Sequence, residues 1–178
     1  SEMCIRDRLD DASIREPVLR ALTDDKAGLD KLPLEPFLAA LKDENPRVRA
    51  QALISLGRLG RREAGKAILP LTIRPSDQPE PAAKPAFKQP DPGRVIPHLA
   101  VRALESCNSV AACLDAMEGP YSAGAFWALK YMHTEEAVSG LAAGLSRPQT
   151  DATSREILPT QVRIYHPEGD YNRGWCAT

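Results

Sequence analysis

The stretch DENPRVRAQALISLGRLG, residues 43–60, decides the fold because it encodes a helix that is apolar on nearly every side. On a helical wheel its polar side chains form one narrow stripe, which consists of Arg47, Gln51, Ser55 and Arg58. Asn45 suits the cap and Pro46 the first turn, while Gly57 and Gly60 are expected to let the chain turn at the end. Because the polar stripe is so narrow, other helices must cover this helix on several sides. The stretch therefore predicts an inner helix of a stack.

The Ala-Leu pair at the centre of this helix recurs along the chain. It stands in RAL at 20–22, QAL at 51–53, RAL at 102–104 and WAL at 127–129, with a weaker echo, EIL, at 156–158. Shorter amphipathic stretches alternate with these copies, at residues 34–42, 62–71, 109–117 and 135–145. The pattern predicts a repeated unit with an amphipathic outer helix and an apolar inner helix, stacked so that each unit buries its face on the next.

Proline density and the chain ends suggest the domain organisation. Residues 74–97 hold seven of the 16 prolines, a density that stops both helix and strand, so this segment is predicted to be an insertion loop within one repeat. The opening SEMCIRDR resembles non-native read-through, which excludes residues 1–8 from the fold. We expect a repeat domain over residues 9–166, a truncated C-terminal extension over 167–178, and a longer parent protein.

The order of features in residues 43–60 resembles a HEAT repeat: an acidic turn, a proline, V-R, the A-L centre and then L-G. The resemblance implies an all-α fold, an alpha-alpha superhelix. Its form would be a HEAT-like solenoid of about four antiparallel helix pairs. It also implies a non-catalytic scaffold whose partners are other proteins.

Three further stretches resemble the HEAT segment of large exported bacterial proteins: DPGRVIPHLAVRAL (91–104), GPYSAGAFWALKYMH (119–133) and VRIYHPEGDYNRGW (162–175). Those proteins join a sugar-dehydrogenase-like propeller and HEAT repeats to a C-terminal c-type cytochrome. The resemblance implies a spacer or docking scaffold in an exported or periplasmic electron-transfer oxidoreductase, with neighbouring domains as partners. It places haem c elsewhere in the parent and assigns this segment no catalytic residue, cofactor or metal. At Cys176 the sequence departs from the family, which has a second tryptophan there.

Charge and hydropathy exclude some partners. The 23 Lys and Arg nearly balance 24 Asp and Glu, which argues against a nucleic-acid or anionic-membrane partner recruited by net charge. No apolar run approaches the roughly 20 residues that span a bilayer. A cluster of arginines lies beside acidic residues and is predicted to form a solvated ion-pair face: Arg47, Arg49, Arg58, Arg61 and Arg62. We therefore expect no nucleic-acid partner.

Seven of the nine aromatic residues lie beyond residue 120, which suggests an interaction surface. The candidate residues are Tyr121, Phe126, Trp127, Tyr131, Tyr165 and Trp175. Phe126 and Trp127 are adjacent on one predicted helix and cannot share a face, so at least one is expected to reach a groove. The alternative, which ordinary burial favours, is that these aromatics fill the core and cover the end of the solenoid.

The remaining polar candidates favour structural roles. Cys107 and Cys113 fall near a helix junction and are predicted to be buried structural thiols, since the chain has no C-x-x-C pair. His98 and His133, on different inner helices, are expected to be ordinary hydrogen-bonded histidines. His166, Glu168 and Asp170 could be drawn as a metal site, but Pro167 and Gly169 favour an exposed turn. CAT at 176–178 could begin a haem attachment motif, although the family resemblance runs past this point without one.

Two alternative functions stay open. A HEAT-like lyase that attaches a tetrapyrrole chromophore would need a deep groove lined with aromatic side chains and a reactive cysteine or histidine. A nucleic-acid-binding HEAT array would need a concave face dense in lysine and arginine.

Overall fold

The chain is described by a computed structural model over residues 9, 11–73, 92–145, 156, 157 and 160. Throughout these residues the regular structure is helical, and the predicted all-α fold is confirmed. The α-helices are α2 (Arg15–Asp24), α3 (Glu35–Ala40), α4 (Pro46–Leu59), α5 (Gly65–Ile68), α6 (Pro92–Ser106), α7 (Val110–Asp115), α8 (Ser122–Leu129) and α9 (Glu135–Leu145). Short 3-10 helices join them: η2 (Leu29–Lys31), η3 (Arg62–Ala64) and η4 (Leu69–Thr72).

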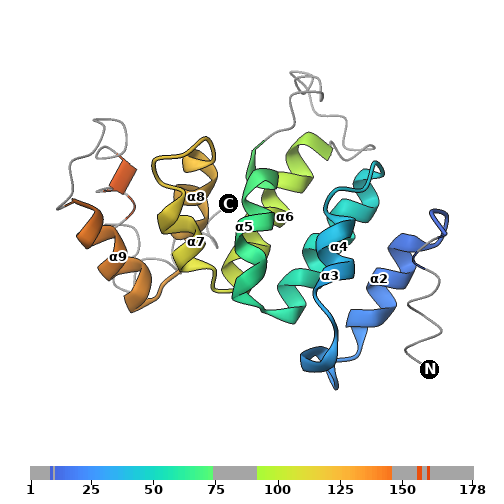
Figure 1. The fold of residues 1–178 in the computed structure, drawn as a ribbon. Coiled ribbons are helices and arrows are strands. Elements are labelled where there is room, and N and C mark those ends of the chain that lie inside the picture. Colours follow the sequence, from blue (N-terminus) through green and yellow to red (C-terminus); the bar gives the residue numbers. More distant parts are fainter. Residues whose placement is uncertain (1–8, 10, 74–91, 146–155, 158–159, 161–178) are drawn as a thin grey trace, which may run out of the picture.

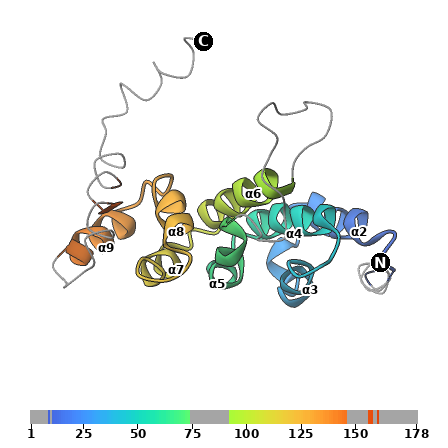
Figure 2. The same cartoon turned by 90° about the horizontal axis from the view of Figure 1, so that it is seen from above.

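The helices stand in two rows (Figures 1 and 2). The inner row consists of α2, α4, α6 and α8, and the helices α3, α5 and α7 form the outer row. Helix α4 packs between α2 and α6, and α6 in turn packs against α8. Each inner helix thus contacts the inner helices of the neighbouring repeats. The pairs α3–α4, α5–α6 and α7–α8, flanked by α2 and α9, give the predicted solenoid.

The ends of α4 follow the local sequence. The side chain of Asn45 accepts a hydrogen bond from the Arg47 N–H at 3.0 Å, and Pro46 occupies the first turn. Gly60 closes the helix in the left-handed region with φ of 63°, and its N–H donates to the Leu56 carbonyl at 3.1 Å. The predicted cap and the turn at Gly60 are therefore confirmed.

The central leucine of each Ala-Leu pair is buried. Leu53, Leu104 and Leu129 are fully buried, and Leu22 is 8% exposed. In the weak echo at 156–158, Ile157 stands at the alanine position and is fully buried, and Leu158 lies outside the described residues. The register that the sequence repeat predicted is thus the register of the core.

Part of the polar stripe of α4 is buried in the contact with α2. Ser55 is fully buried; its hydroxyl donates to the Leu19 carbonyl at 3.2 Å and lies 3.0 Å from the Thr23 hydroxyl, both on α2. Gln51 donates to the Ser55 hydroxyl at 3.3 Å. Ile54, by contrast, is 38% exposed. These polar side chains can be buried because each has a hydrogen-bond partner, Ser55 on α2 and Gln51 on Ser55 of its own helix.

Two boundaries differ from the sequence prediction. Helix α6 begins at Pro92 and contains Pro97, so the end of the predicted 74–97 loop is helical; residues 74–91 lie outside the described residues. Pro97 sits near the start of α6, where one lost backbone hydrogen bond is offset by burial of Ile96 and Val101. The predicted outer helix over 62–71 is split into η3, α5 and η4, and α5 ends before Pro70, which cannot donate an N–H to continue it.

We expect Leu53→Asp and Leu104→Asp to unfold the chain, because each carboxylate would be buried without a partner. Ile54→Asp, one residue along the same helix, and Arg58→Ala should each change the free energy of unfolding by only about 1 kcal/mol or less, since both side chains are partly exposed. Thermal unfolding followed by circular dichroism measures the difference. Similar melting temperatures for all four variants would contradict the inner-helix assignment.

Gly124→Ala should destabilise the fold by about 1–3 kcal/mol, because the added methyl group would overlap the Thr72 side chain of η4. Gly57→Ala is the matched control. Its methyl group would lie 3.6 Å from the Ala103 Cα, in ordinary contact, and alanine favours the helix by up to about 1 kcal/mol. Chemical unfolding of the two variants tests this, and a Gly124→Ala protein as stable as the native chain would show that α8 and η4 pack less closely.

Candidate interaction face

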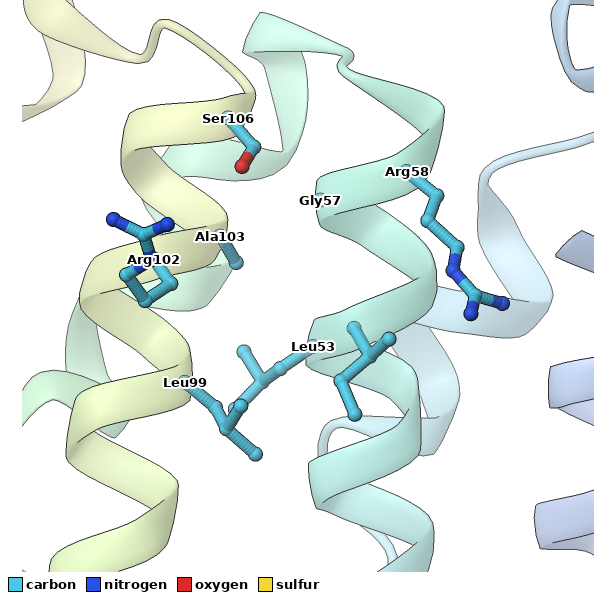
Figure 3. Close-up of a pocket in the computed structure, with 8 residues that line it drawn as sticks. Leu53, Gly57, Arg58, Leu99, Arg102, Ala103 and Ser106 are labelled. Atoms are coloured by element: carbon cyan, nitrogen blue, oxygen red, sulfur yellow. The ribbon is translucent and has the colours of Figure 1, made fainter. Parts of the chain in front are cut away.

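An open groove of about 250 Å³ lies between the inner helices α4 and α6. It is lined by Leu53, Ile54, Gly57, Arg58, Leu99, Arg102, Ala103 and Ser106. Figure 3 shows Leu53 and Leu99 pointing toward one another from the two helices, with Arg58 and Arg102 on the outer sides of the pair. The groove thus has an apolar centre between two guanidinium groups.

Small residues shape this groove. Gly57 faces α6, and a Cβ built on it would lie 3.6 Å from both the Ala103 Cα and the Ser106 Cβ. Gly57 therefore does not help to end α4, as the sequence suggested, but lies within the helix at a close approach of two backbones. Because Gly57 and Ala103 have little or no side chain, the helices come close there and leave space beside Leu53 and Leu99.

The two groove arginines are held by acidic residues. Arg58 donates to Asp24 of α2 at 2.7 Å, and Arg102 donates to Glu105 of its own helix at 2.7 Å. Their side chains keep 39% and 69% of their surface exposed. Both guanidinium groups are thus positioned by a carboxylate and still accessible from outside.

The predicted ion-pair face is present, with different partners from those nearest in sequence. Arg58 crosses to Asp24, and Arg62 pairs with Glu136 at 3.1 Å. Arg49 donates to the carbonyls of residues 43 and 44, and Arg61 to those of residues 29 and 30, so both tie backbone segments together. Arg58, Arg61 and Arg62 thus join separate repeats, whereas Arg49 braces the loop before its own helix.

Asp43 joins the first two inner helices from the loop before α4. It forms an ion pair with Arg15 of α2 and accepts a hydrogen bond from the Asn45 N–H at 2.8 Å. Burial alone would raise the pKa of Asp43, but the Asn45 and Arg15 hydrogen bonds outweigh it, so the pKa lies below its ordinary value. The carboxylate therefore stays charged at neutral pH and supports the contact.

The predicted aromatic surface is only partly at the surface. Phe126 is 3% exposed and belongs to the core, which corrects its assignment to an interaction surface. Trp127 is half-buried and meets the exposed His98 of α6 edge to face, with ring centroids 4.8 Å apart. The predicted division between the two neighbours is confirmed, because a helix turns adjacent side chains to different faces.

None of the described aromatic candidates, Trp127 included, lines the groove between α4 and α6. Tyr121 and Tyr131 are half-buried against the core cluster. Tyr165 and Trp175 lie outside the described residues.

Sequence reasoning missed Leu99 and Arg102 as groove residues. The recurrent RAL at 102–104 marks their helix, but its pairing with α4 depends on a contact across more than 40 residues of sequence.

Cys107 and Cys113 are buried, as predicted for structural thiols. The Cys107 thiol donates to the Leu56 carbonyl of α4 at 3.3 Å. Burial raises the pKa of Cys107 to about 11 and that of Cys113 to about 12. Because the thiolate is the nucleophile, neither residue is reactive near neutral pH.

In the described part of the chain, no cluster of three or more His, Cys, Asp or Glu side chains is placed to hold a metal ion. No helix among the same residues has the length and apolarity to cross a bilayer. The predicted candidates His166, Glu168, Asp170 and Cys176 lie outside the described residues.

Comparison with known proteins supports the repeat assignment. The protein-family model described as HEAT repeat matches residues 34–62, which span α3 and α4 and the loop after them. No curated protein matches the chain. The helix pair α3–α4 thus matches a HEAT repeat, within an all-α solenoid. HEAT repeats typically act as interaction scaffolds, whereas the link to exported dehydrogenase–cytochrome proteins stays a prediction.

The two buried thiols should make stability fall in alkaline solution. Their folded-state pKa values are raised above the ordinary 9.0, so the unfolded chain loses these protons first and rising pH favours unfolding. The contribution is fully present below about pH 9 and is lost progressively toward pH 11–12, by at most about 1.4 kcal/mol per pH unit for each thiol. Urea unfolding of the native chain and of Cys113→Ala checks this. The variant should show the shallower decline, and parallel curves would refute the assignment.

Proposed function

We propose that this HEAT-repeat chain is a non-catalytic scaffold that binds proteins through the inner face of its solenoid. The observation that carries the proposal is the groove between α4 and α6, where the exposed Ile54 lies beside an apolar centre. Exposed aliphatic side chains in a concave surface, bounded by charged groups, are typical of protein contact sites. The HEAT repeat at residues 34–62 supports the same conclusion.

The packing supports a scaffold. Each inner helix is fixed by its neighbours, so the array presents a continuous face without needing a bound ligand to order it. The two described cysteines, Cys107 and Cys113, are buried, and burial raises the pKa of both thiols, so neither supplies a reactive thiolate near neutral pH. The eight groove residues include no aromatic side chain, which the chromophore lyase would require.

The finer proposal concerns the parent protein. The chain would be the HEAT segment of an exported bacterial electron-transfer protein, placed as spacer or docking surface between a sugar-dehydrogenase-like propeller and a c-type cytochrome. The resemblance of residues 91–104 and 119–133 to such segments supports it, and these residues include most of α6 and all of α8. Haem c would then be a cofactor of another domain.

The full reading frame that contains this chain tests the context. A propeller domain upstream and a C-x-x-C-H haem motif downstream are the expected result. A complete frame with neither domain would refute the electron-transfer context and leave the scaffold proposal intact.

Binding measurements test the scaffold itself. Titration calorimetry of the chain with the neighbouring domains of its reading frame, produced separately, should detect binding to at least one of them. Covalent attachment of a tetrapyrrole, seen as new visible absorbance on a target protein, would contradict the non-catalytic assignment. Absence of binding to every neighbouring domain would contradict the docking role.

A further inference from the structure

We propose that the groove between α4 and α6 binds an acidic segment of a partner protein, with one apolar side chain of that segment seated against Ile54 and Leu99, above the buried Leu53. The inference rests on the proposed scaffold function and adds the chemistry of the partner. Three properties of the groove carry it: its size, its apolar centre and the charge of the two helices that form it.

The size of the groove suits a side chain. Its volume of about 250 Å³ lies below the roughly 300–1,000 Å³ of pockets that hold small-molecule ligands. The groove is also open, with Leu53 and Leu99 facing each other across it in Figure 3. One aliphatic or aromatic side chain from an extended or helical segment fits these dimensions better than a cofactor does.

The apolar centre of the groove exposes a large aliphatic side chain to water, which is rare on the described surface. Ile54 and Leu145 are the large hydrophobic residues that stay exposed among the described residues, and only Ile54 borders the groove. Covering an aliphatic side chain gains about 25 cal/mol for each Å² removed from water. A contact centred on Ile54 and the half-buried Leu99 therefore supplies the hydrophobic part of a binding site.

The positive charge of the two helices that form the groove indicates an acidic partner. Helix α4 carries three arginines and no acidic residue, and α6 carries two arginines and one glutamate, so these helices have net charges of +3 and +1 in a chain whose net charge is −1. Arg102 uses Nη1 to bind Glu105, and a guanidinium has five N–H donors, so Arg102 can bind a second carboxylate. Acidic residues on both sides of the seated apolar side chain complement this surface.

A peptide accounts for the groove better than a nucleic acid. Nucleic-acid affinity depends on several phosphates neutralised by lysine and arginine along a track. The two guanidinium groups that border the groove are separated by aliphatic side chains and form no continuous track. A phosphate backbone would leave the apolar centre exposed, whereas an acidic peptide satisfies both parts.

Selection from a random 12-residue peptide library on the immobilised 178-residue chain tests the inference. We expect enriched peptides to carry Asp or Glu on both sides of Leu, Ile, Phe or Met. The strongest of them, measured by fluorescence anisotropy, should bind Arg102→Glu and Ile54→Ser at least tenfold more weakly than the native chain. Its affinity should also fall as the salt concentration rises.

Lys66→Glu is the matched control, because it reverses a charge on α5, in the outer row, at a side chain that is 79% exposed. It should change affinity less than twofold, and circular dichroism should show that all variants remain folded. A loss with Lys66→Glu as large as with Arg102→Glu would overturn the inference, because it would indicate attraction by overall charge.

Other results separate the inference from the scaffold proposal. Enriched peptides without acidic residues, peptides that bind both groove variants normally, or no enrichment would overturn the acidic-groove inference. Binding to neighbouring domains would still decide the scaffold role. A single-stranded oligonucleotide that displaces the peptide and binds more tightly would assign the groove to nucleic acid instead.

Discussion

The packing of α4 between α2 and α6 is the constraint on which the rest of the structure depends. An isolated helix of 14 residues is marginal in water, so α4 derives its stability from both neighbours. On the α2 side, the Ser55 hydroxyl of α4 donates a hydrogen bond to the Leu19 carbonyl. On the α6 side, the Leu56 carbonyl of α4 accepts a hydrogen bond from the Cys107 thiol. Helix α4 therefore forms hydrogen bonds as well as apolar contacts with both neighbouring inner helices, and each repeat depends on the next for its stability.

The same constraint produces the candidate interaction face. Close approach at Gly57 and Ala103 brings two inner helices together, and their remaining leucines cannot fill the space beside that contact. Among the described residues, no helix covers the face of α4 turned away from the outer row, and Ile54 is exposed there. Arg58 and Arg102 border the groove, so the surface left open by packing also has guanidinium groups at its edges.

Much of the fold follows from the sequence because helix formation is governed by local spacing. The Ala-Leu repeat located the buried leucines, and Asn45 and Gly60 marked the ends of α4. The polar stripe was harder to interpret, since a wheel cannot show that Thr23 would satisfy Ser55 from another helix. Pro97 likewise stands inside α6, because the burial of its neighbours outweighs one lost hydrogen bond.

The sequence by itself determined the all-α architecture, the inner and outer helices and the leucines of the core, because these depend on periodicity within a few turns. It separated Phe126 from Trp127 for the same reason. Only the tertiary structure decided which residues meet at the groove, which ion pairs join repeats, and that Trp127 lies against His98. Those contacts join residues far apart in the chain, and their partners are fixed by how the helices stack.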